Sequence, residues 1–220
     1  NNTTGTTPII NTVDCLVGAM DETITPPFKP SNYFDGGIDE LRIWDIALTS
    51  DQIRKMMNQE IQNDNGTIQG SIVPIDIVGV SWSNLNGYFR MNQSSDLSSG
   101  NLTSSNGSSV NGLLRYMTTL QAETAPLPYT SVSNGSWDNS NTWLHGNVQA
   151  IPNSLGIDGS TPINWNIVQT SHDVTSGNKN ITLLGLNVQN NQLTIANTDP
   201  LNGQSLRITD YLKIDGTLSL

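Results

Sequence analysis

The stretch YFDGGIDELRIWDIALTSDQI, residues 33–53, combines a glycine turn, an alternating segment and a helix start. After the Gly-Gly turn, alternation of side chains predicts a strand over residues 38–44. Further on, Thr49 and Gln52 have the spacing of a capping box, in which each side chain bonds the other residue's backbone amide. Apolar residues then recur at helical spacing up to residue 61. The stretch therefore predicts a strand followed by a short amphipathic helix over residues 50–61.

The two faces of the predicted strand differ in polarity. Asp39, Leu41 and Ile43 share one face, which we expect to be the inner one. Glu40 and Arg42 lie beside each other on the outer face. A charge on an inner face is costly unless it is paired or coordinated. Asp39 is therefore expected either to accept hydrogen bonds from turn amides or to bind a cation.

A family resemblance attaches to these residues. The motif FDGxIDELRIWxxAL at residues 34–48 resembles the closing strand of laminin-G-like (concanavalin A-like) jelly rolls, and LVGAM at residues 16–20 stands where such domains have the preceding strand. A jelly roll needs about eight strands, and far fewer fit here. We therefore expect residues 1–62 to be the C-terminal part of a laminin-G-like jelly roll, with the sequence beginning inside a domain.

The resemblance also implies a cation. Related jelly rolls hold Ca²⁺ between the closing strand and the opening one, which makes Asp39 and, more weakly, Asp35 candidate metal ligands. The partner ligands would lie upstream of residue 1 or at Asp96.

Composition favours a mostly β protein. Only 13% of the residues are charged and 35% are hydrophobic, and the remainder is rich in residues that suit polar turns between short strands. The net charge of −10 disfavours nucleic acid as a partner, because a binder must neutralise phosphates with Lys and Arg. No apolar run approaches the about 18 residues of a transmembrane segment. Acidity instead suits a soluble extracellular surface and leaves carboxylates for calcium.

Residues 63–128 are expected to form a strand-rich connector. Residues 72–78 could make an edge strand in which Pro74 donates no ladder bond. Residues 85–91 predict a further strand, and the order of motifs over residues 85–114 is similar to the opening strands of laminin-G-like domains. A proline-rich stretch at residues 125–129 then ends the segment.

Residues 129–220 contain short apolar pieces separated by Asn and Gly. Strands of this length suit the rungs of a β-solenoid (β-helix), with a sandwich of hairpins as the alternative. The spacing of Trp137 and Trp143, followed by a Val…Ile-Pro corner, is similar to segments that open β-solenoid regions in very large surface proteins of gliding Bacteroidota. That resemblance implies an adhesive protein on the exterior of the outer membrane, exported by the type IX secretion system.

Catalysis is not expected. Glycosidases need two carboxylates about 5 to 9.5 Å apart, and no Glu-x-Asp-x-x-Glu strand motif occurs. His145 and His172 lie in polar turns without a nucleophile or metal spacing. Aromatic side chains in turn-rich surroundings could stack on sugars, although each is more often a core residue: Trp82, Tyr88, Trp137, Trp143 and Trp165.

These observations lead to one expected function and two alternatives. We expect a non-catalytic fragment of a large secreted cell-surface adhesin that binds glycans or cell-surface polymers. The alternatives are accessory modules of a secreted carbohydrate-active enzyme and a passive structural stalk. Because unpaired sheet edges invite pairing with another chain, we expect both ends to be covered by the remainder of its own chain or by the type IX secretion machinery.

Overall fold

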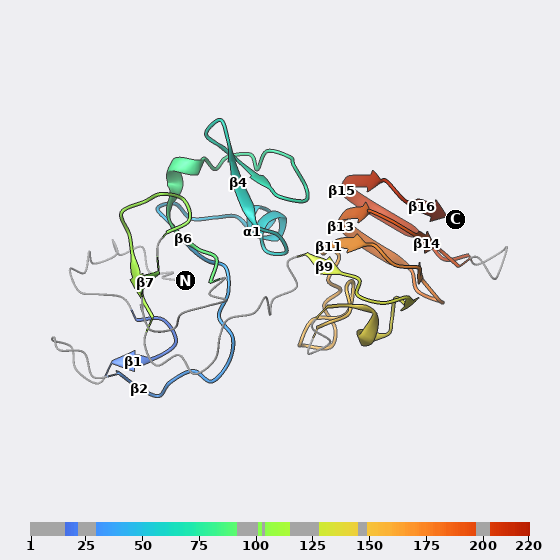
Figure 1. Cartoon of the computed structure of the whole chain (residues 1–220), viewed down its shortest axis with the longest axis horizontal. Helices are drawn as coiled ribbons and strands as arrows, with labels where there is room; N and C mark the ends of the chain where they lie inside the picture. The colour runs from blue at the N-terminus through green and yellow to red at the C-terminus, as the bar shows by residue number, and fades with distance from the viewer. Residues whose placement is uncertain are drawn as a thin grey trace. The chain divides into compact units, whose positions relative to one another are not determined.

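The structure is a computed structural model that describes residues 16–21, 30–91, 101–102, 104–114, 128–144, 149–196 and 203–220. It divides into two compact units, residues 1–38 and residues 39–220. The described residues form 16 strands and a single α-helix (Figure 1), which confirms the mostly β class. The boundaries predicted after residues 62 and 128 stay predictions, and Asp96 and His145 lie outside the described residues.

The first unit contributes one short antiparallel pair. Strand β1 (Met20–Asp21) pairs with β2 (Pro30–Ser31). The amide of Phe34 donates to the carbonyl of Gly18 at 2.8 Å, and Gly18 has a φ of +80°, which favours glycine.

The capping box was predicted correctly, but the helix is shorter than expected. Helix α1 (Ser50–Met56) begins with both reciprocal bonds between Thr49 and Gln52 in place. Residue 61 instead starts β4 (Ile61–Asp64), which forms a hairpin with β5 (Thr67–Gly70). Asn65 and Gly66 have φ of 51° and 93°, as a type I′ hairpin turn requires. The polar run after residue 62 is therefore a turn between strands and does not stop a helix.

The predicted strand at residues 38–44 is present in part, and its inner face was predicted wrongly. Strand β3 (Leu41–Trp44) starts late, because Glu40 has a φ of 51° and breaks the extension. Ile43 is 41% exposed, whereas the side chains of Arg42 and Glu40 are only 10% and 9% exposed. The face that carries Glu40 and Arg42, which we expected to be the outer one, therefore points inward.

The apolar stripe expected on the helix is also only half correct. Met56 and Ile61 are buried, but Ile53 and Met57 are exposed. The buried residues join the first core cluster, whose members come from α1, the hairpin and the segment after it: Met56, Ile61, Ile68, Ile77, Val80, Leu85 and Tyr88.

The segment after the hairpin differs from expectation at its start. Residues 72–78 form no strand, although Val73 and Ile77 are buried there, so that prediction is wrong. The Ile77 amide donates to the Ile68 carbonyl at 2.8 Å. This hydrogen bond holds the loop at residues 72–78 against β5 of the hairpin. The strand predicted next is confirmed as β6 (Leu85–Phe89), which follows the 3₁₀ turn η1 (Trp82–Asn84) and pairs antiparallel with β3. Two short strands, β7 (Asn101–Leu102) and β8 (Gly112–Leu113), pair beyond it.

The remaining strands form two four-stranded parallel sheets (Figure 1). One contains β9 (Tyr129–Thr130), β11 (Ile167–Thr170), β13 (Ile181–Val188) and β15 (Leu206–Ile214). The other contains β10 (Gly135–Ser136), β12 (Val174–Thr175), β14 (Gln192–Thr194) and β16 (Thr217–Ser219). The chain alternates between the sheets at every step, so each strand lies beside the strand two earlier in sequence.

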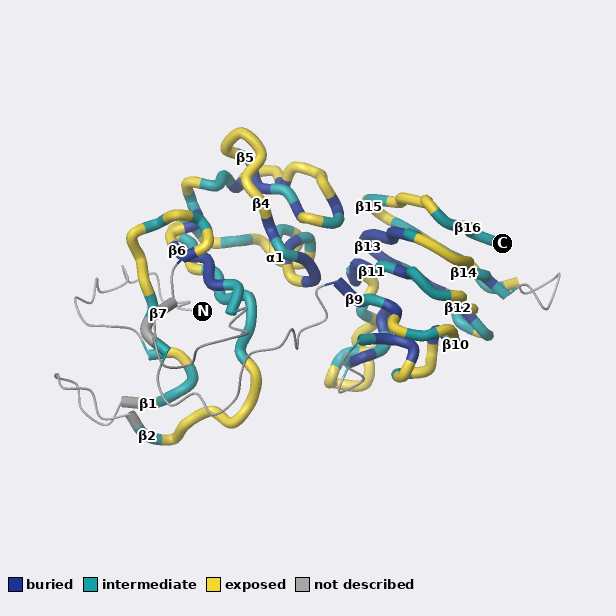
Figure 2. Tube along the Cα trace, viewed as in Figure 1, coloured by how far each residue is buried: buried dark blue, intermediate teal, exposed yellow. Residues whose placement is uncertain are grey.

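The core of this region is apolar and includes two tryptophans. Figure 2 shows dark blue buried segments along β11 and β13, and the buried cluster includes Leu183, Leu186 and Leu193. Trp137 and Trp143 pack edge to face with ring centroids 4.9 Å apart. Their indole nitrogens donate to the carbonyls of Pro152 and Trp137, each at 2.9 Å. These hydrogen bonds satisfy the two buried N–H groups.

Helix α1 and the loop after the hairpin pack on the parallel sheet of β9, β11, β13 and β15. Val73 lies in a buried cluster with Ile167 and Leu184. The Arg54 guanidinium lies 4.2 Å from the centroid of the Trp165 ring. Polar contacts accompany this packing: Asn166 donates to Asn58 at 3.1 Å, and Lys55 pairs with Asp210 at 3.4 Å. Residues 39–91 and the sheet are therefore parts of one packed unit.

Candidate functional site

The two predicted metal ligands, Asp39 and Asp35, belong to different compact units. Asp39 is half-buried, and its Oδ1 accepts a hydrogen bond from the amide of Glu40 at 2.9 Å. Asp35 is exposed and belongs to the other compact unit. Within the described residues no group of three or more His, Cys, Asp and Glu side chains could hold a metal ion. The contact of Asp39 with a local amide matches the alternative considered from the sequence.

The candidate sugar-stacking aromatics separate into two groups. Tyr88, Trp137 and Trp143 are at most 2% exposed and belong to the two cores. Trp165 is half-buried beneath the Arg54 guanidinium. Trp82 is also half-buried, but it lines a pocket. Of these five aromatics, Trp82 is therefore the candidate for contact with a ligand.

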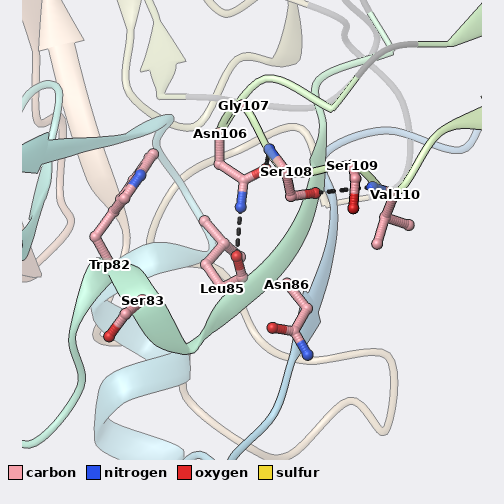
Figure 3. Close-up of a pocket in the computed structure, with 9 residues that line it drawn as sticks. All are labelled: Trp82, Ser83, Leu85, Asn86, Asn106, Gly107, Ser108, Ser109 and Val110. Carbon is pink, nitrogen blue, oxygen red and sulfur yellow. Dashed lines mark hydrogen bonds between the residues drawn. The ribbon is translucent and has the colours of Figure 1, made fainter.

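An open pocket of about 400 Å³ lies beside Trp82. Figure 3 shows its nine lining residues, which come from residues 82–86 and from the loop at residues 106–110. They are Trp82, Ser83, Leu85, Asn86, Asn106, Gly107, Ser108, Ser109 and Val110. None of these nine side chains is charged, so the pocket is suited to a neutral ligand.

Trp82 is held from both sides of its 3₁₀ turn. Its amide donates to the Gly66 carbonyl at 2.9 Å. Asn84 accepts from the Ser81 amide at 3.0 Å and donates to Asp45 Oδ1 at 3.0 Å. Part of the indole also packs on the first core cluster. The backbone that carries the indole is therefore held in place before any ligand arrives, which lowers the entropic cost of binding.

The opposite wall is tied to β6 by side-chain hydrogen bonds. Ser104 Oγ accepts from the Tyr88 amide at 2.9 Å, and Asn106 Nδ2 donates to the Leu85 carbonyl. Asn106 Oδ1 accepts from the Ser108 amide at 3.2 Å and from Ser104 Oγ at 2.5 Å. Gly107 follows with a φ of +75°. Asn106 therefore holds the loop in place, because its side-chain carboxamide already makes hydrogen bonds within the protein.

A buried ionic network fixes β6 from its other side. Tyr88 Oη donates to Glu40 Oε2 at 2.6 Å, and Arg42 Nη2 donates to the same oxygen at 2.5 Å. Arg42 also donates to the carbonyl of Met56, the last residue of α1, at 2.8 Å and to the carbonyl of Gln59 at 2.7 Å. Burial raises the pKa of Glu40 despite the opposing effects of Tyr88 and Arg42, and burial raises the pKa of Tyr88 to about 12. The Tyr88 hydroxyl therefore keeps its proton near neutral pH and can donate to Glu40.

Sequence reasoning singled out Trp82 but missed Asn86, Asn106 and Val110. The pocket joins residues about twenty positions apart through the bond from Asn106 to the Leu85 carbonyl. The one sequence feature that marks the loop is its run of Ser, Asn and Gly at residues 104–109, which predicts only a turn.

Comparison of this chain with known proteins found no similar protein. No family model, no curated protein and no solved structure matches this chain. Within the described residues, no helix is long and apolar enough to cross a membrane.

Proposed function

We propose that this chain is a non-catalytic saccharide-binding module of a secreted cell-surface adhesin, and that the pocket beside Trp82 is its binding site. The observation that carries the proposal is the combination of a half-buried indole with hydroxyl and amide groups in a pocket whose lining side chains carry no charge. A sugar ring has an apolar C–H face and a polar rim of hydroxyls. An aromatic surface beside uncharged hydrogen-bonding groups complements both parts.

The lining also supports binding without catalysis. Glycoside hydrolysis needs an acid and a second carboxylate on either side of the scissile bond. None of the nine lining residues is acidic. We therefore favour an adhesive module over the accessory part of a carbohydrate-active enzyme, and over a passive stalk that binds nothing.

The finer architecture belongs to the same proposal. The alternation of successive strands between two parallel sheets supports a β-solenoid over residues 129–220. The FDGxIDELRIW resemblance supports a laminin-G-like jelly-roll origin for residues 1–62, with residues 63–128 as connector. The two resemblances together support an outer-surface location in a Bacteroidota bacterium and export by type IX secretion. Calcium binding by Asp39, with Asp35 as the weaker candidate, is part of this proposal.

Binding of neutral oligosaccharides tests the proposed function. Isothermal titration with neutral trisaccharides should show saturable binding by the full chain. Trp82→Ala should weaken binding by about tenfold or more, because the aromatic contact is lost. Trp82→Phe should keep most of the affinity, since it retains an aromatic face.

Trp165→Ala is the matched control, because this second half-buried tryptophan does not line the pocket. It should leave the affinity unchanged, with circular dichroism confirming that each variant is folded. Absence of binding to every neutral saccharide tested, or equal losses in Trp82→Ala and Trp165→Ala, would overturn the proposal.

A further inference from the structure

We infer that the pocket selects N-acetylated amino sugars over plain hexoses, an inference that rests on the proposed saccharide site. It deepens that proposal by assigning separate tasks to two lining residues, Asn86 and Val110. Neither residue stands out in the sequence, and both lie on a backbone that the structure holds in place.

Asn86 offers a carboxamide that is ready to bind. It is exposed on β6, and within the described part of the chain its side chain makes no hydrogen bond. Figure 3 shows it without a dashed line, whereas Asn106 above it is bonded to the Leu85 carbonyl. Its backbone is held because the neighbouring Gly87 pairs with Ile43 across the β3–β6 ladder. Of the two amides in the pocket, Asn86 is therefore the one open to a ligand.

Val110 gives the pocket an apolar patch away from the indole. Its side chain is 42% exposed, and its amide donates to Ser108 Oγ at 3.3 Å. The residues beside it in the loop, Ser108 and Ser109, are polar. A ligand that presented only hydroxyls here would leave this patch without an apolar partner.

An N-acetyl group has the two features that these residues require. Its N–H can donate to Asn86 Oδ1, or its C=O can accept from Asn86 Nδ2; a trans amide points these two groups in opposite directions, so one such hydrogen bond forms. Its methyl group can cover Val110 and remove apolar surface from water. Burial of a methyl-sized group corresponds to about a fourfold gain in affinity, and one added hydrogen bond to a further gain of about twofold to tenfold. A preference of about tenfold or more over the unacetylated hexose follows.

The absence of charge in the lining sharpens the expected specificity. A free amino sugar carries an ammonium group and an acidic sugar carries a carboxylate. Neither ion would find a charged partner among the nine lining side chains, and an unpaired ion loses hydration on binding. The preferred ligand is therefore neutral as well as acetylated.

Titration with three matched trisaccharides tests this inference. The probes are the β-1,4-linked trimers of N-acetylglucosamine, glucose and glucosamine. The acetylated trimer should bind more tightly than the glucose trimer by about tenfold or more, and the glucosamine trimer should bind most weakly at neutral pH. Val110→Ser should reduce the preference for the acetylated trimer while keeping binding of the glucose trimer. Asn86→Ala should also reduce that preference.

Matched controls come from residues outside the pocket. Val132 is 45% exposed and Asn178 is exposed, and neither lines the pocket, so Val132→Ser and Asn178→Ala should change nothing. Equal affinity for the acetylated and the glucose trimers would overturn the inference while leaving the proposed saccharide site intact. A preference that persists in both pocket variants would also overturn it. If no trimer binds, the proposed function itself fails.

Discussion

Substitution of Arg42 by methionine should be among the most damaging single changes in the chain. The guanidinium is only 10% exposed and donates to Glu40 Oε2 and to the carbonyls of Met56 and Gln59, at 2.5, 2.8 and 2.7 Å. Methionine keeps much of the apolar stem but leaves the Glu40 carboxylate buried without its cation. Breaking a buried ion pair by removing one partner costs about 3 to 5 kcal/mol. That is a large part of the about 5 to 15 kcal/mol that stabilises a typical domain.

Urea unfolding monitored by tryptophan fluorescence measures this cost. Lys179→Met is the matched control, because Lys179 pairs with Asp138 at 2.9 Å while the Asp138 side chain is 55% exposed. An exposed pair of this kind contributes about 1 kcal/mol or less. The double variant Glu40→Gln/Arg42→Met should recover part of the loss, since it removes the stranded charge. Equal midpoints for Arg42→Met and Lys179→Met would refute the assignment of a buried ionic network.

Three further predictions concern pH, calcium and the hairpin. Burial raises the pKa of Glu40 above its ordinary value, so the stability that the protonated side chain contributes is present at low pH and is lost as the pH rises through the folded pKa. The unfolding free energy of the wild type should therefore fall relative to that of Glu40→Gln between acid and neutral pH. A difference that stays constant with pH would exclude a raised pKa. Calcium should raise the Tm of the chain, and Asp39→Asn, which retains an acceptor for the Glu40 amide, should abolish the shift; no shift in either protein would leave Asp39 as a turn acceptor only. Gly66→Ala should cost about 1 kcal/mol in urea unfolding, because its φ of +93° strains any other residue although no atom crowds the added methyl; an unchanged midpoint would contradict the type I′ turn.

Features decided by neighbouring residues could be predicted from the sequence. The capping box of α1 depends on Thr49 and Gln52 alone, and it formed as its spacing predicted. The burial of Trp137 and Trp143 agrees with the general behaviour of large aromatic residues in a chain with few of them. Several strands of residues 129–220 follow similarly from apolar pieces between Asn and Gly.

Features decided by distant partners could not be predicted. Alternation in residues 38–44 identified two faces but not which one would be buried, because the partners of Arg42 lie 14 and 17 residues away and Tyr88 lies 48 residues from Glu40. These partners outweigh the apolar character of Ile43. The pocket depends in the same way on Asn106, whose amide reaches the Leu85 carbonyl 21 residues earlier. A sequence pattern contains no information about such pairings until the fold is known.

The indole N–H resonances of the five tryptophans provide the most direct test of saccharide binding beside Trp82. They can be followed in a two-dimensional ¹H–¹⁵N NMR titration of the full chain with the N-acetylglucosamine trimer, after assignment by single Trp→Phe variants. We predict a saturable shift of the Trp82 resonance, whereas the resonances of Trp137 and Trp143 should stay fixed because their N–H groups are buried and hydrogen bonded. The opposite result, a Trp82 resonance that does not move at saturating trimer or shifts confined to other tryptophans, would contradict the assignment of this pocket as the binding site.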